Sequence, residues 1–227
     1  ICEWRHTGGA RVGLSFGGGG STPCSGGACP LEHAGGIMRN NIVLNCPAAP
    51  GVDINRSQDI SIRHNTIYRS WGVVARSPGT VATVRNNLMS GASGTRDGAT
   101  LVGDGNIEAG FAISAYAPGA AARLKEQLDD PSLKDRLDRF AGWWSDSALG
   151  RNDAKLNEWF RDPGKADFRL KDGISAGKLA GDLKLPHPSH DFCGQARGAI
   201  VQVGAIDYGR GDCDAQGWLD RLLKRFP

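Results

Sequence analysis

Asp53, Arg76 and His33 are the side chains of this sequence best suited to acid–base chemistry and to holding an anion. Asp53 lies in one of three short segments that begin with a glycine, which span residues 13–16, 51–54 and 72–75, and Arg76 directly follows the last of them. Their alignment places Ser15 beside Asp53, and Asn55 beside Arg76. In parallel strands about 4.8 Å apart, these outward side chains form one polar patch. There Asp53 and His33 are candidate acid–base groups, and Arg76 is a candidate clamp for a carboxylate.

A series of arginines forms a second group of candidates. Segments 37–43, 61–67 and 83–89 align without gaps as IMRNNIV, SIRHNTI and TVRNNLM. Their arginines, Arg39, Arg63 and Arg85, are expected to stack as a column of like charge. Such a column attracts an anionic ligand or the carboxylates of a partner. The alternative is a row of solvated arginines that pair with aspartates of this chain, for which Asp53, Asp59 and Asp97 are available.

The glycine-rich loop from residue 17 to residue 33 supplies the remaining candidates. Glu32 and His33 at its base provide acid–base groups near Ser15, and a relay of Ser15, His33 and Asp53 is conceivable, although no GxSxG elbow surrounds Ser15. Glu32, Asp53 or Asp97 could hold calcium, but no DxDxDG loop is present. The GGGG run lacks the residues of a nucleotide-binding loop. We therefore predict no cofactor, with calcium as the one possible ion.

A repeat positions these side chains. The steps between the aligned arginines are 24 and 22 residues, which is typical of a stacked solenoid. Each arginine is followed two residues later by an asparagine, namely Asn41, Asn65 or Asn87. Asparagine tolerates the left-handed backbone of a bend, and stacked asparagines satisfy one another's buried amides. Alternation directs Val52 with Ile54, Ile60 with Ile62, and Val73 with Ala75 toward the interior. This pattern predicts a parallel β-helix rather than an antiparallel sandwich.

The rest of the chain differs from the coils. Leucines recur at three and four residues between 119 and 161, which predicts a helical insertion packed on the solenoid. A short helix near 216–225 is expected to cap the last coil. The predicted fold is therefore all-β, a right-handed parallel β-helix with a helical insertion and a C-terminal capping helix. Its parts are coils at 1–112, the insertion at 113–162, and the last coil with its cap at 163–227.

Several segments resemble bacterial secreted right-handed parallel β-helix proteins of the pectate-lyase-like superfamily. They are RNNIVLN, RHNTIYRS and VRNNLMSG, then DFRL at 167–170 and DFCGQARG…VGAIDY within 191–208. The resemblance implies a polysaccharide substrate on an exposed strand face. Lyase chemistry on a uronic acid needs a cation for the carboxylate, here Arg76, and a base. Members of this superfamily usually have more coils upstream, so the resemblance also implies a C-terminal portion that pairs with a separate N-terminal chain.

Composition limits the setting. The 227 residues carry a net charge of +3 and include 33 glycines, about 15% and roughly twice the usual share. This balance indicates neither a nucleic-acid-binding tail nor, without an apolar run of 18 residues, a membrane span. Six cysteines without CxxC spacing favour three disulfides and a secreted or periplasmic location. Cys24 with Cys29 and Cys193 with Cys213 would close short loops, which leaves Cys2 with Cys46, although sequence does not determine connectivity.

Together these features predict a secreted carbohydrate-active enzyme, a lyase or hydrolase of an acidic polysaccharide. The catalytic residues would be Asp53, Arg76 and His33. The substrate-binding residues would be Ser15, Asn55, Arg39, Arg63, Arg85 and Glu32. Two alternatives remain: a non-catalytic carbohydrate-binding or cell-surface module, and a structural fragment that assembles with an N-terminal chain.

Overall fold

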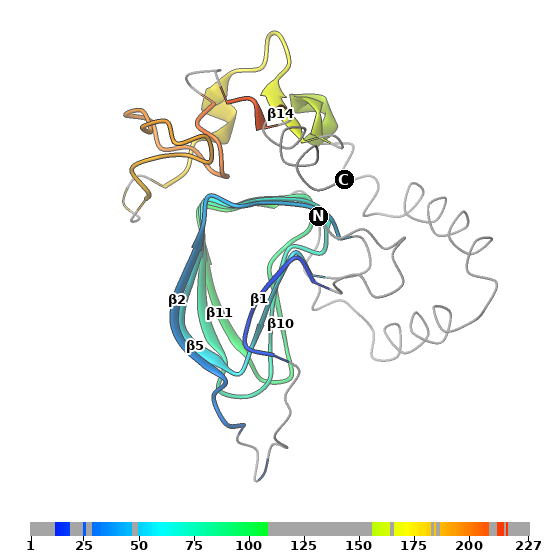
Figure 1. Ribbon diagram of the computed structural model, residues 1–227, viewed down its shortest axis with the longest axis vertical. Helices are drawn as coiled ribbons and strands as arrows, with labels where there is room; N and C mark the ends of the chain where they lie inside the picture. The colour runs from blue at the N-terminus through cyan, green and yellow to red at the C-terminus, as the bar shows by residue number, and fades with distance from the viewer. Residues whose placement is uncertain are drawn as a thin grey trace, which may run out of the picture.

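The computed structural model describes residues 12–18, 25, 29–46, 50–108, 156–163, 166–182, 184, 187–208, 213–215 and 217. Within these ranges the chain forms about three turns of a parallel β-solenoid, with a C-terminal segment packed beside it (Figure 1). The predicted all-β, β-helical fold is confirmed.

Each coil contributes one strand to each of three parallel sheets. The first sheet consists of β1 (Leu14–Phe16), β4 (Val52–Asn55), β7 (Val73–Arg76) and β10 (Gly94–Arg96). The second consists of β2 (His33–Arg39), β5 (Ser57–Arg63), β8 (Val81–Arg85) and β11 (Thr100–Asp104). The third consists of β3 (Ile42–Cys46), β6 (Thr66–Ser70), β9 (Leu88–Met89) and β12 (Ile107–Glu108).

The interior of the solenoid is apolar, as the alternation predicts. Ile54, Ile62 and Val73 are fully buried, and they belong to one core cluster that all three sheets line. Burial of a side chain of this size stabilises the fold by about 2 kcal/mol relative to exposure. Because equivalent residues stack from coil to coil, each layer of the core supports the next one.

An asparagine ladder runs along the bend between the second and third sheets. The backbone N–H and the Nδ2 of Asn41 donate to Oδ1 of Asn65, at 3.0 and 2.9 Å. Asn65 donates in the same way to Asn87, at 2.9 and 3.0 Å. A fourth member, Asn106, accepts both bonds from Asn87. The ladder of Asn41, Asn65 and Asn87 is therefore confirmed, and it extends one coil further than the sequence indicated.

The left-handed residue of each bend is the one that precedes the ladder asparagine. The φ angles are 55° at Asn40, 51° at His64 and 52° at Asn86, and Gly105 takes this position in the last coil at 60°. The expectation that the ladder asparagines themselves adopt this backbone is wrong by one residue. We call Asn40, His64, Asn86 and Gly105 the corner column.

The corner column anchors the C-terminal segment to the solenoid. The contacts are Asn40 Nδ2 to the His190 carbonyl (2.6 Å), His64 Nδ1 to the Gln202 carbonyl (3.1 Å) and Asn86 Nδ2 to the Asp182 carbonyl (3.2 Å). The Asp182 N–H returns a bond of 2.9 Å to Asn86 Oδ1. Polar side chains at the bends thus bind backbone groups that lie 96 to 150 residues later in the chain.

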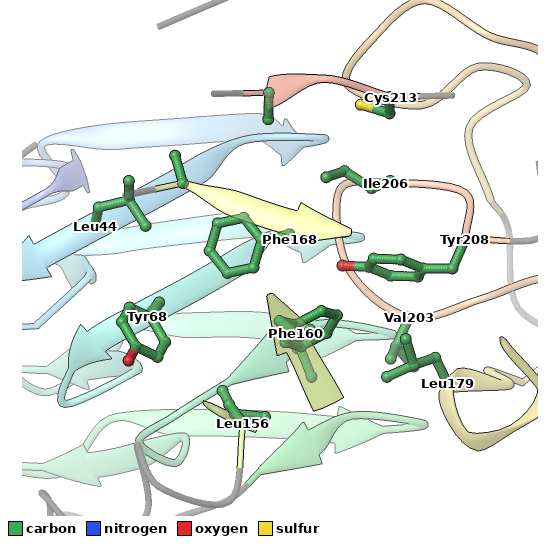
Figure 2. Close-up of a cluster of buried hydrophobic side chains, with 13 residues drawn as sticks. Leu44, Tyr68, Leu156, Phe160, Phe168, Leu179, Val203, Ile206, Tyr208 and Cys213 are labelled. Carbon is green, nitrogen blue, oxygen red and sulfur yellow. The ribbon is translucent and has the colours of Figure 1, made fainter. Parts of the chain in front are cut away.

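The third sheet is apolar on both faces because the C-terminal segment covers its outer face. Leu44 and Tyr68 point away from the solenoid core and join a second cluster with Phe160, Phe168 and Leu179 (Figure 2). Phe160 and Phe168 lie on an antiparallel pair, β13 (Phe160–Asp162) and β14 (Asp167–Leu170), and Leu179 lies on the 3-10 helix η3 (Ala176–Leu179). The fold therefore has two cores that share one sheet.

Disulfides fix part of this arrangement. Cys193 and Cys213 are bonded, with their Cα atoms 5.6 Å apart, which confirms that predicted pair. Cys29 and Cys46 are also disulfide-bonded, and their partners lie outside the described residues, as do Cys2 and Cys24. Among the described residues, no helix is both long and apolar enough to cross a membrane.

Most of the predicted helical insertion at 113–162 and of the capping helix at 216–225 also lies outside the described residues. Residues 156–159 are helical, and β13 follows them directly. The predicted domain boundaries remain predictions.

The ladder predicts a graded loss of stability. Asn65→Leu should lower the free energy of unfolding by roughly 3 kcal/mol or more, since it leaves buried partners on two coils unsatisfied. Asn41→Leu, at the end of the ladder, should cost less because Asn41 Oδ1 accepts no bond from another described residue. Urea denaturation measures both values, and equal losses would contradict the stabilising role of the ladder.

His64 predicts a pH dependence of stability. Burial, with a smaller contribution from the nearby Arg197, lowers the pKa of His64 from 6.5 to about 3. The unfolded chain therefore binds a proton that the folded chain rejects, and stability falls as pH drops from 6.5 toward 3, by up to about 1.4 kcal/mol per pH unit. Urea midpoints between pH 7 and pH 4 should show a flatter slope for His64→Asn, which copies the neighbouring corner residues. His190→Asn, at an exposed histidine, should keep the wild-type slope.

Candidate functional site

The first sheet brings together the predicted polar positions in the expected register. Ser15 pairs with Asp53, Asp53 with Val74, and Asn55 with Arg76. These residues face away from the apolar core, on the side where the glycine-rich loop begins. The alignment of the glycine-led segments therefore gave the correct neighbours.

Asp53 and Arg76 are bound to each other rather than open to solvent. The Arg76 Nε donates to Oδ1 and Oδ2 of Asp53 at 3.2 and 3.1 Å, and its NH2 lies 3.0 Å from Oδ2. Asp53 is 7% exposed and Asn55 is 1% exposed. The strand face is therefore not exposed at Asp53 and Asn55 as expected, because the long Arg76 side chain folds back over the shorter residues of the preceding coil.

The same residues hold the beginning of the glycine-rich loop. Arg76 NH2 and Asn55 Nδ2 both donate to the Gly18 carbonyl, at 3.2 and 2.6 Å. The Gly18 N–H donates to Glu32 Oε2 at 2.5 Å, and Glu32 also pairs with Arg56 at 3.5 Å. Both backbone groups of Gly18 are thus satisfied by predicted site residues. These contacts support a structural role, and the catalytic and binding roles assigned to Asp53, Arg76, Asn55 and Glu32 stay predictions.

Ser15 and His33 do not form the relay considered from the sequence. Ser15 is exposed, and no hydrogen bond between the described residues joins Ser15, His33 and Asp53. The His33 ring instead lies against Phe16, with centroids 4.7 Å apart. No group of three or more His, Cys, Asp or Glu residues in the described part of the chain is arranged to hold a metal ion. Calcium binding stays a prediction.

The arginine column lies on the outer face of the second sheet. Arg39 pairs in register with Arg63, and Arg63 with Arg85, so the three stack one per coil as expected. The column ends on β11 at Asp104, which pairs with Arg85 in the register. We call Arg39, Arg63 and Arg85 the arginine column.

The guanidinium groups of the column are not neutralised within the described chain. Among the described residues, no carboxylate oxygen lies within 4 Å of any of them, so the pairing with Asp53, Asp59 or Asp97 considered from the sequence is not formed. The Nε atoms of Arg63 and Arg85 are covered and have no hydrogen-bond partner. Stacked like charges repel, and bound anions would relieve that repulsion.

A second column of side chains runs beside the arginines. Its members are Ile37, Ser61, Thr83 and Val102, which pair in register from β2 to β11. Hydroxyl groups therefore flank Arg63 and Arg85, and exposed apolar side chains occupy both ends. Sequence reasoning missed this column, although its members lie two residues before Arg39, Arg63, Arg85 and Asp104 and could have been found from the same alignment.

This outer face can bind a linear polyanion that carries hydroxyl groups. A guanidinium can donate two parallel hydrogen bonds to one carboxylate. The Ser61 hydroxyl can both donate and accept, whereas Thr83 Oγ1 donates to the Ile60 carbonyl at 3.3 Å and can still accept a bond from a ligand. The spacing of about 4.8 Å between coils sets the repeat of the charges. A ligand that contacts all three arginines must run across the strands, along the solenoid axis.

The second core contains a small cavity away from this face. Its volume is about 170 Å³, and its lining includes Arg161, Arg169, Phe168 and Tyr208. Arg169 is paired with Asp167 at 2.6 Å, which also holds the pKa of that carboxyl below its usual value. Because Arg169 is already paired, the cavity is a weaker candidate for anion binding than the arginine column.

The contacts of Asp53 predict a loss of stability when its charge is removed. Asp53→Asn should lower the free energy of unfolding by roughly 2 kcal/mol, between the values for exposed and fully buried ion pairs. The matched control is Asp97→Asn, since Asp97 pairs with Arg96 at 3.7 Å on the exposed surface and its loss should change little. Thermal and urea denaturation compare the two variants. Unchanged stability in both would argue for a functional rather than structural carboxylate.

Comparisons with protein-family models, with curated proteins and with solved structures find no match for this chain.

Proposed function

We propose that this β-helix binds an acidic polysaccharide along the arginine column. The observation that carries the proposal is the register of Arg39, Arg63 and Arg85, which presents one unneutralised guanidinium per coil on an open sheet face. The flanking hydroxyls of Ser61 and Thr83 suit the hydroxyl groups of a sugar chain. A net charge of +3 favours the approach of an anion.

Polysaccharide fits this surface better than a compact anion. The arginines form an extended row rather than converging on one point, so the matching ligand carries carboxylates at regular intervals. A polyuronate is such a chain, with one carboxylate on each sugar and hydroxyls between them. Exposed Ile37 and Val102, at the two ends of the neighbouring column, offer apolar contact to sugar rings.

The geometry favours binding of a polysaccharide over its cleavage. Lyase or hydrolase turnover needs an acid–base pair within reach of the bound sugar, and Asp53 with Arg76 is already engaged on a different sheet. Turnover therefore remains a prediction that binding assays can test at the same time. The Cys193–Cys213 bond favours an oxidising compartment, and we propose that the protein acts outside the cytosol.

The test measures binding of the folded chain to polygalacturonate, dextran and polyglutamate by calorimetry. We expect binding to polygalacturonate that weakens with added salt, and no binding to neutral dextran. Equal affinity for polyglutamate and polygalacturonate would show that the site binds polyanions in general, and would contradict the choice of a polysaccharide. Ultraviolet absorbance of unsaturated uronates in the same samples reports any lyase activity.

A variant pair locates the site. Arg63→Gln should weaken binding to polygalacturonate roughly tenfold, which corresponds to the loss of about one charge-assisted hydrogen bond. Arg96→Gln removes an exposed arginine from the first sheet and should leave affinity unchanged. Circular dichroism confirms that both variants fold. Equal effects of the two substitutions would show that net charge, rather than the arginine column, controls binding.

A further inference from the structure

The two ends of the described part of the solenoid, at β2 and at β11, have complementary surfaces, and the first sign of this is the polarity of the asparagine ladder. In each inner step, an Oδ1 accepts two bonds from the asparagine of the preceding coil. At the β2 end, Asn41 Oδ1 accepts no bond from any described residue. At the β11 end, the Asn106 N–H has no acceptor among the described residues, and Asn106 Nδ2 donates only to the Val84 carbonyl. One end therefore offers an acceptor and the other end offers donors.

The charges at the two ends are also opposite. The arginine column begins at Arg39 on β2 and reaches Asp104 on β11 in the same register. Both side chains are exposed, and neither forms an ion pair within the described chain. Asp104 has Arg85 as its register neighbour within the chain, without a close ion pair. If the β11 end of one molecule continues onto the β2 end of another, Arg39 comes beside Asp104 on its other side, so that the carboxylate lies between two arginines at the spacing of neighbouring strands.

The column of Ile37, Ser61, Thr83 and Val102 beside the arginines also has matching ends. Val102 on β11 is 48% exposed and Ile37 on β2 is 55% exposed, and they occupy equivalent positions of the column that contains Ser61 and Thr83. Stacking end to end would place these apolar side chains side by side. The unpaired backbone groups of β2 and β11, the outermost described strands of the second sheet, would complete the hydrogen bonds.

We infer that the β2 end of this chain binds the β11 end of a second copy of the same chain. The two ends match in three ways. Within the described residues, the asparagine ladder has a free acceptor at one end and free donors at the other, the arginine column has opposite charges at its two ends, and the neighbouring column has an apolar side chain at each end. A head-to-tail contact of this kind uses two different surfaces and does not close on itself, so it generates an open filament along the solenoid axis. A separate N-terminal chain of the same repeat is the competing occupant of the β2 end. The inference does not depend on polysaccharide binding.

The test is sedimentation velocity of the purified 227-residue chain over a range of concentrations, without polysaccharide, together with negative-stain electron microscopy. We expect a series of oligomers that grows with concentration, shrinks with added salt and appears as unbranched rods. A chain that stays monomeric at every concentration would overturn the inference and leave the separate N-terminal chain as the occupant. Closed dimers would overturn it as well, since they require a symmetric contact.

Charge reversal supplies the sharper experiment. Arg39→Glu places like charges at the contact between two copies of that variant, and Asp104→Lys does the same for copies of the second variant. Each variant alone should lose assembly, whereas an equal mixture should regain it. In a filament in which the two variants alternate, every contact joins opposite charges. Arg63→Glu makes the same change one coil inward and should assemble as the wild type does. Circular dichroism checks the fold of each variant, and failure of the mixture to reassemble would overturn the inference.

Discussion

The amide ladder along the bend between the second and third sheets sets the register of the whole solenoid. Each ladder asparagine joins its own coil to the next through two bonds to a single Oδ1. A slip of one residue would turn every strand over and would bury the outward polar side chains. The bend is therefore the place where register is fixed. The stacking of the arginine column follows from it, because each arginine lies two residues before a ladder asparagine, and the inward residues of β5 and β8 stack in the same register.

The bend also explains how two cores coexist. In three coils the left-handed residue before the ladder asparagine has a polar side chain that points outward, and all three of these side chains bond the C-terminal segment. That segment then covers the outer face of the third sheet, where Leu44 and Tyr68 would otherwise be exposed. His64 is the least expected member, because a buried neutral imidazole replaces the amide found on neighbouring coils. Its lowered pKa is a consequence of this docking.

The sequence repeat predicted most of the fold but missed specific features. Asn41, Asn65 and Asn87 share one alignment, so their ladder could be predicted, whereas Asn106 follows Asp104-Gly105 and escapes a search for arginine followed by asparagine. Sequence alternation correctly placed Asp53 outward. It could not show that Arg76 from the next coil folds over Asp53, because that depends on side-chain reach and on where the loop at Gly18 runs. Outward and exposed are different properties, and a periodic pattern reports only the first.

This difference separates the two sets of arginines. Arg76 lies beside a carboxylate one coil away and a loop carbonyl, so its charge is used within the fold. In the arginine column, the residues one coil above and below Arg63 are again arginines, and stacking in register therefore prevents neutralisation of Arg63 within the sheet. A repeat that places the same charged residue on successive coils creates a surface that needs counterions from outside. The spacing of the strands then sets which anions can supply them, and that constraint favours a regular polymer over a scattered set of small ions.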